Sequence, residues 1–138
     1  MSDVDVANGI KHVIDQDSAI KTWSEDIGGV TVLVGNDALV QSDDWPLVRV
    51  VADDEDVIEE QINQVFTIQQ EFNLVLQIDP TEDDENWETL VVFKDHVKRI
   101  IKANIQLNGS CYHAQVGRAE QTDKGEHTLF VMTLREET

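Results

Sequence analysis

The sequence predicts a single α+β domain over residues 1–138, with a mostly antiparallel sheet of four to five strands and two helices packed on one face. Residues 65–78 alternate between apolar and polar side chains, and residues 4–15 and 86–104 have helical periodicity. Short β-branched runs lie between and after these stretches. Strands adjacent in sequence tend to pair, which favours antiparallel order.

The first predicted helix covers residues 4–15. Its apolar face consists of Val6, Ile10, Val13 and Ile14. Asp17 and Ser18 are suited to cap a second short helix through Trp23, and a continuation of the first helix fits the same residues. The pair Gly28 and Gly29 ends the segment.

Two compact apolar runs predict short strands at residues 30–34 and 47–51. Pro46 precedes the second run, and proline is suited to the first position of a strand. Residues 53–60 contain six carboxylates, and we expect a loop or a frayed helical turn there.

The long alternating run predicts a half-buried strand at residues 65–78, on the order of 45 Å in length. The apolar side consists of Phe66, Ile68, Phe72, Leu74, Leu76 and Ile78, with Gln70 as its only polar residue. The other side includes Thr67, Gln69, Glu71, Asn73 and Gln77. A strand of this length is either the centre of the sheet or one long strand or hairpin that projects toward a neighbour.

An acidic loop at residues 79–88 leads into the most regular helical pattern of the chain, at 86–104. Lysine and arginine close this helix, as the helix dipole favours. The last thirty residues predict a hairpin with a turn at residues 123–125. Its apolar side chains are Tyr112, Ala114 and Val116 on one strand and Phe130, Met132 and Leu134 on the other.

The charge balance restricts the classes of partner. Ten Lys and Arg against 28 Asp and Glu give a net charge of −18, so most of the surface repels a phosphate backbone, and sequence-specific nucleic-acid binding is not expected. The acidity fits either a salt-rich environment or a functional patch. No apolar run approaches a membrane span, and the single cysteine excludes an intrachain disulfide, so we expect a soluble protein that does not contact membranes.

No motif predicts a catalytic, cofactor or metal site. The histidines, which lack metal-binding spacing, are His12, His96, His113 and His127. Cys111 and His113 share one side of a predicted strand, where a nucleophile with its base and a buried thiol are the two interpretations. The loop at 79–88 lacks the order of an EF-hand, so a solvated acidic loop is favoured over a Ca²⁺ site.

Lys94 and Lys98 fall within the apolar arc of the second predicted helix. Either their stems lie along the edge of the core with the amines in water, or this edge meets a second subunit and the lysines pair with one of its acidic clusters.

The order of elements resembles the tail terminator family of long-tailed phages, also called tail-to-head joining or minor tail proteins. The stretches that carry the resemblance are the long strand at 72–78, the helix at 90–105, Gly109 after it, the closing strand at 128–135, and the strand that begins at 45–48 after an N-terminal helix. The resemblance covers most of the chain through the order of its elements.

The resemblance implies a structural protein of the virion tail or neck, assembled in the host cytoplasm and without enzymatic activity. Its subunits would form a homohexameric ring that ends tail-tube polymerisation and binds the tube protein and the head-completion or connector protein. DNA would pass through an acidic lumen without specific binding. Candidate residues for the subunit interface or lumen are Thr67, Gln69, Glu71, Asn73, Asp83, Asp84, Glu85, Lys94 and Lys98.

Two alternatives fit the same composition. Another neck protein, for head closure or tail completion, would have similar features. An acidic protein that imitates DNA and inhibits a DNA-binding enzyme would also carry a large negative charge. Such a mimic needs carboxylates spaced regularly along an elongated face, whereas the sequence predicts that they gather in two loops.

We expect that replacement of Asp83, Asp84 and Glu85 by Asn or Gln leaves folding intact, because a solvated loop makes few contacts that a charge change disrupts. Circular dichroism and urea unfolding measure this. Loss of the folded state would instead indicate an ordered or metal-bound loop.

Overall fold

The computed structural model describes residues 3–25, 29–35, 46–60, 66–78, 86–121 and 126–137. In chain order the elements are α1 (Asp3–Asp15), α2 (Ser18–Ser24), β1 (Thr31–Val34), β2 (Leu47–Glu60), β3 (Phe66–Gln77), α3 (Asn86–Ala103), β4 (His113–Gln121) and β5 (His127–Glu137).

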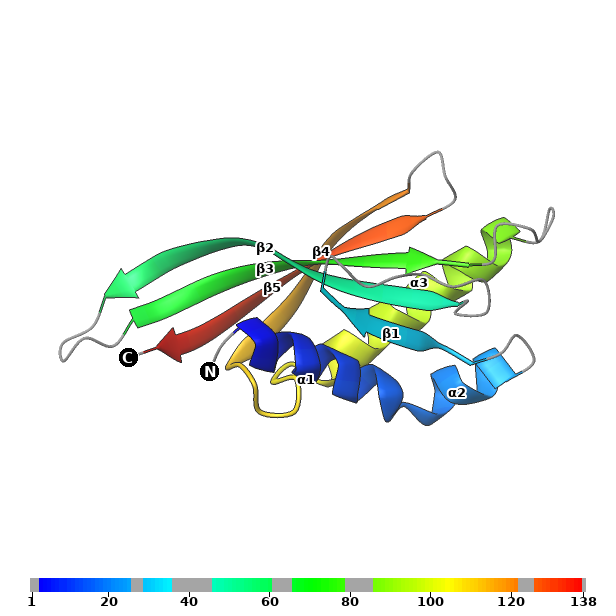
Figure 1. The fold of residues 1–138 in the computed structure, drawn as a ribbon, viewed down its shortest axis with the longest axis horizontal. Helices are drawn as coiled ribbons and strands as arrows, with labels where there is room; N and C mark the ends of the chain where they lie inside the picture. Colours follow the sequence, from blue (N-terminus) through cyan, green and yellow to red (C-terminus); the bar gives the residue numbers. More distant parts are fainter. Residues whose placement is uncertain are drawn as a thin grey trace.

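The strands form one five-stranded sheet in the order β1-β2-β3-β5-β4, and the helices lie along one side of it (Figure 1). β1 runs parallel to β2, and all other neighbours are antiparallel. The predicted α+β class is confirmed, with a third helix in addition to the two expected. Of the two interpretations of residues 17–23, the separate helix is present: the Asp17 carboxylate accepts the Ile20 N–H at 2.8 Å and caps α2.

β3 occupies the centre of the sheet. Phe72, Leu74 and Leu76 are fully buried on the helix side, so the predicted alternation is confirmed. β2 pairs with one edge of β3 and β5 with the other, each along nearly the whole strand. The structure therefore does not confirm one long strand or hairpin that projects alone from the domain.

The prediction of a loop or frayed helical turn at residues 53–60 is wrong, because β2 continues through these residues to Glu60. Pairing with β3 holds this acidic stretch extended, with register shifts between Ala52 and Glu55 and between Val57 and Glu59. At the first shift the Gln70 amide donates to the Asp53 carbonyl at 3.1 Å. These contacts come from residues distant in sequence, so local propensity did not reveal them.

The predicted hairpin is present as β4 and β5, but the apolar residues predicted on one side of the last strand do not face the core. The fully buried residues of β5 are Leu129 and Val131, which lie opposite Leu74 and Phe72 of β3. Phe130, Met132 and Leu134 therefore face the other side of the sheet. Both alternating sets of β5 are apolar, so periodicity alone was ambiguous and the register with β3 decides. On β4, Ala114 is buried as expected and Tyr112, just before it, is 48% exposed. The predicted turn at 123–125 lies outside the described residues.

The core lies between the sheet and the helices α1 and α3. After α3 the chain turns through Leu107, Asn108 and Gly109, all with positive φ, before β4 begins. Leu107 is fully buried in this turn. On α1, Gly9 packs directly against the turn: a Cβ at this position would overlap the Leu107 carbonyl oxygen and the Ser110 side chain. The absence of a side chain at Gly9 thus lets α1 and the turn approach each other.

We expect Gly9→Ala to lower the free energy of unfolding by about 1–2 kcal/mol, because overpacking against backbone outweighs the gain of about 1 kcal/mol that alanine gives inside a helix. Urea unfolding measures the change. Asn8→Ala, at an exposed neighbouring position on α1, is the control and should be neutral or stabilising. A stabilised Gly9→Ala protein would contradict the close packing.

Candidate interaction surfaces

The face of the sheet opposite the described helices, here called the open face, carries four of the predicted interface residues. Thr67, Gln69, Glu71 and Asn73 alternate along β3 with the buried residues and are half-buried. The structure thus places these four side by side on one surface, as the period-two pattern predicts.

β5 adds apolar side chains to the open face. Phe130 lies opposite Asn73, Met132 opposite Glu71, and Leu134 opposite Gln69 in the register. All three are half-buried. The open face is therefore a mixed surface, in which polar residues of β3 border an apolar row of β5.

Two contacts order the side chains of this row. The Gln69 amide lies 3.1 Å from the Met132 sulfur, and the Arg118 guanidinium of β4 lies over the Phe130 ring, 4.9 Å from its centroid. The sequence predicted the three residues of this row as the apolar side of the last strand but did not place them on the face away from the helices. A surface that combines apolar, amide and arginine groups is typical of protein–protein interfaces.

A polar cluster lies on the helix side of the sheet, where β2, β3 and β5 meet. Arg135 is 2% exposed, and its guanidinium pairs with the Glu55 carboxylate at 2.5 Å. The Thr133 hydroxyl donates to the Gln70 carbonyl at 3.3 Å. This cluster joins the acidic part of β2 to the sheet, since a buried arginine requires a nearby carboxylate.

A second group of side chains joins α2 to α3. Two guanidinium nitrogens of Arg99 donate to the two carboxylate oxygens of Asp17 at 3.1 and 2.8 Å. This hydrogen bonding lowers the pKa of Asp17. The Trp23 ring stacks on Phe93, with ring centroids 5.6 Å apart, and its centroid lies 5.2 Å from that of His96. We interpret this group as a structural clamp.

Lys94 and Lys98, the predicted interface lysines, are both half-buried on α3. They lie near His127, the buried first residue of β5. Burial lowers the pKa of the His127 imidazole, and the positive charges of Lys94 and Lys98 lower it further. Lys102 follows Lys98 by one further step of four residues and is exposed.

Cys111 does not have the surroundings of a nucleophile. Its thiol is buried beside the Ile105 carbonyl, at 3.6 Å, and burial raises its pKa to about 11. The thiol is therefore protonated at neutral pH, whereas a reactive cysteine needs a thiolate. His113 is exposed at the start of β4.

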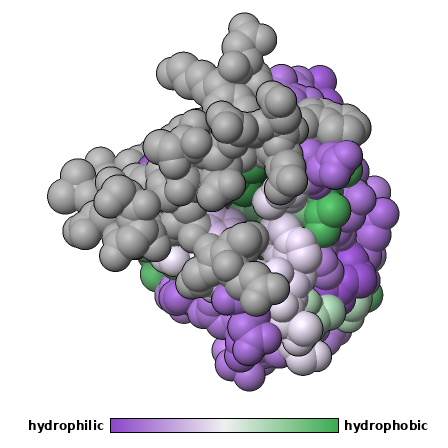
Figure 2. Space-filling view, turned by 90° about the vertical axis from the view of Figure 1, so that its right-hand side faces the viewer, coloured by the Kyte–Doolittle hydropathy of each residue, from purple (hydrophilic) through white to green (hydrophobic). Residues whose placement is uncertain are grey.

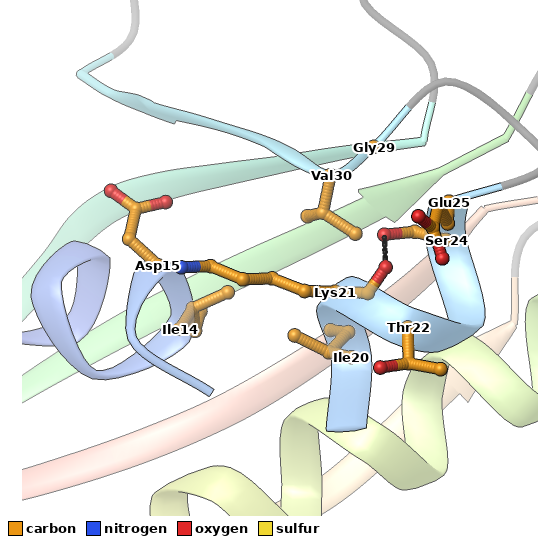
Figure 3. A pocket seen from close by; sticks show the side chains of 9 residues that line it. All are labelled: Ile14, Asp15, Ile20, Lys21, Thr22, Ser24, Glu25, Gly29 and Val30. Carbon is orange, nitrogen blue, oxygen red and sulfur yellow. Dashed lines mark hydrogen bonds between the residues drawn. The ribbon is translucent and has the colours of Figure 1, made fainter. Parts of the chain in front are cut away.

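A cavity of about 580 Å³ lies between the end of α1, α2 and the residues before β1 (Figure 3). Its apolar lining is Ile14, Ile20 and Val30, and its polar lining includes Lys21, which extends toward Asp15 in this view. The Ser24 hydroxyl donates to the Lys21 carbonyl at 3.3 Å. The described lining contains no histidine or cysteine.

The described surface at the end of the molecule shown in Figure 2 is mostly hydrophilic, with small separate hydrophobic areas. Within the described ranges no three His, Cys, Asp or Glu side chains converge as a metal site would require. None of the helices in those ranges is long and apolar enough to cross a membrane. The remaining predicted interface residues, Asp83, Asp84 and Glu85, lie outside the described residues.

Comparison with models of known protein families gives no match, and a search of curated proteins finds none that is significantly similar.

We expect the stability of the protein to fall as the pH drops below about 6.5, because the folded state holds His127 with a lowered pKa and the unfolded state takes up the proton first. His127→Gln should reduce this slope, and Lys94→Met should reduce it less. Urea unfolding between pH 8 and pH 5 measures both variants. An unchanged slope in His127→Gln would contradict this account.

Proposed function

We propose that this protein is a structural subunit of a tailed virus, a tail terminator that forms a ring at the head-proximal end of the tail. The ring, a hexamer in this proposal, ends polymerisation of the tail tube and joins the tail to the head. Its partners are other copies of the chain, the tube protein and a head-completion or connector protein. The proposal starts from the order of elements in the sequence.

The open face is the observation that best supports a role in assembly. An apolar row of Phe130, Met132 and Leu134 lies half-buried on a sheet face that no described helix covers. Such a row, bordered by the polar residues of β3, suits a contact with another protein. No described cluster of side chains offers a comparable basis for catalysis.

The net charge of −18 supports the proposed passage of DNA. Carboxylates repel phosphates, so a ring of such subunits would let the duplex move through without adhesion. The ring would act by geometry, because one face matches the end of the tube and the other prevents a further tube ring from stacking.

The extended acidic stretch of β2 favours a second candidate, inhibition of a DNA-binding enzyme by DNA mimicry. The sequence predicted that these carboxylates gather in a loop, which argued against mimicry. In the structure, residues 53–60 instead run along a strand, so their backbone positions follow one another at about 3.3 Å. A linear series of carboxylates is the feature that a mimic requires.

We expect light scattering to give six times the subunit mass, either for the protein alone at raised salt or on addition of the tube protein of the same virus. Salt favours the ring because it screens repulsion between subunits of charge −18. Rings in electron micrographs that cap tube ends are the second readout. A monomer at every salt concentration that binds a nuclease or restriction enzyme tightly would support mimicry and contradict the ring.

A further inference from the structure

Three lysines form a row along one flank of α3. Lys94, Lys98 and Lys102 are spaced by four residues, so each lies about 6 Å further along the helix axis on nearly the same side. Lys94 and Lys98 are half-buried and Lys102 is exposed. We call these three residues the lysine row. It contains three of the ten Lys and Arg residues of a chain with 28 carboxylates.

The lysine row has little counter-charge within the subunit. Lys94 lies 3.9 Å from the Asp95 carboxylate, and in the described part of the chain neither Lys98 nor Lys102 has an ion pair. Like charges four residues apart destabilise a helix. The charges of Lys94 and Lys98 also lower the pKa of His127. A partner that brings carboxylates to the row would relieve this repulsion.

The acidic segment of β2, residues 53–60, has the complementary charge and spacing. It contains Asp53, Asp54, Glu55, Asp56, Glu59 and Glu60. β1 pairs with β2 only from Leu47 to Val50, so no described strand covers the outer edge of this segment. Alternate residues of a strand are about 6.6 Å apart, close to the spacing of about 6 Å along the lysine row. Asp54 and Asp56 are spaced in this way, and Glu59 and Glu60 follow after Val57 and Ile58.

The two surfaces lie apart within one subunit. In Figure 1 the acidic segment forms the left end of the sheet, beyond the helices, whereas α3 runs under the middle and right of the sheet. One molecule therefore cannot bring its own segment to its own lysine row. A second copy can, and because the two surfaces differ, the contact is heterologous and generates a ring when its rotation closes.

We propose that the lysine row of one subunit binds the acidic segment of β2 in a second copy of this chain. This inference rests on the self-assembly in the proposed function and names the contact that carries it. Within the subunit the Asp53 carboxylate accepts the Asn73 amide and Glu55 pairs with Arg135, so the contact with the lysine row would be made by Asp54, Asp56, Glu59 and Glu60. The contact supplies the same charge pairing at every junction of the ring.

Two charge-reversed proteins test the contact. Lys98→Glu with Lys102→Glu makes the row acidic, and Glu59→Lys with Glu60→Lys makes the segment less acidic. We expect each protein alone to associate at least about tenfold more weakly than the original chain, measured by sedimentation at about 0.3 M salt. In an equimolar mixture, one kind of junction between unlike subunits joins the original row to the original segment, and the other joins the new carboxylates of the altered row to the new lysines of the altered segment. Association should then return to within about threefold of the original, and this recovery also shows that both proteins fold.

Matched controls separate the contact from net charge. Asp83→Lys with Asp84→Lys tests the other acidic residues that the sequence predicts at an interface. As controls, Lys11→Glu with Lys21→Glu, on α1 and α2, makes the same change in net charge as the altered row, and Glu25→Lys with Glu120→Lys, at two exposed positions, makes the same change as the altered segment. Both controls should associate like the original chain. Loss of association in the Asp83 and Asp84 protein but not in the Glu59 and Glu60 protein would overturn the choice of segment.

The outcomes also separate this inference from the proposed ring. If the original chain forms a ring and the two altered proteins do so equally well, the proposed contact is wrong, whereas the proposed ring is supported. Weak association in the mixture of two folded variants, verified by circular dichroism, also overturns the contact. If the original chain shows no self-association with or without the tube protein, both the contact and the ring are wrong.

Discussion

The two-sided pairing of β3 is the constraint on which the rest of the structure depends. β2 and β5 pair with its two edges from one end to the other, so the alternation of β3 sets which residues of both neighbours face the helices. Phe72, Leu74 and Leu76 form the centre of the core on that side. The same alternation places Gln69 and Asn73 on the open face. The register of β3 with its neighbours therefore determines both which side chains form the core and which lie on the open face.

Two of the few cationic side chains join elements of the fold, whereas others have no such role. Arg135 is buried against Glu55 and ties the acidic half of β2 to the sheet, and Arg99 joins α3 to the cap of α2. Lys98 and Lys102 have no comparable partner among the described residues. In a chain of net charge −18, Lys94, Lys98 and Lys102 make one flank of α3 basic. Such a contrast favours a specific orientation between subunits.

The strand edges make a continuous sheet between subunits unfavourable. β2 has register shifts in its acidic half, and β4, at the opposite edge, has one between Val116 and Ala119. Irregular, charged edges resist pairing with another strand. Contacts between copies would then use side chains: those of the open face in the proposed function, and those of α3 and the acidic segment of β2 in the proposed contact.

Elements whose signal lies within one segment could be predicted from the sequence. The helices at the N-terminus and at α3, the burial of alternate residues along β3, and the common face of Thr67, Gln69, Glu71 and Asn73 all follow from the period of apolar residues within one segment. The sequence also pointed to Lys94 and Lys98, and the same spacing extends to Lys102. The folded structure was needed to establish that residues 53–60 form a strand, because their extended backbone depends on β3 and on Arg135, eighty positions away from Glu55. It likewise decided which apolar set of β5 enters the core, since both sets fit and only pairing with β3 distinguishes them.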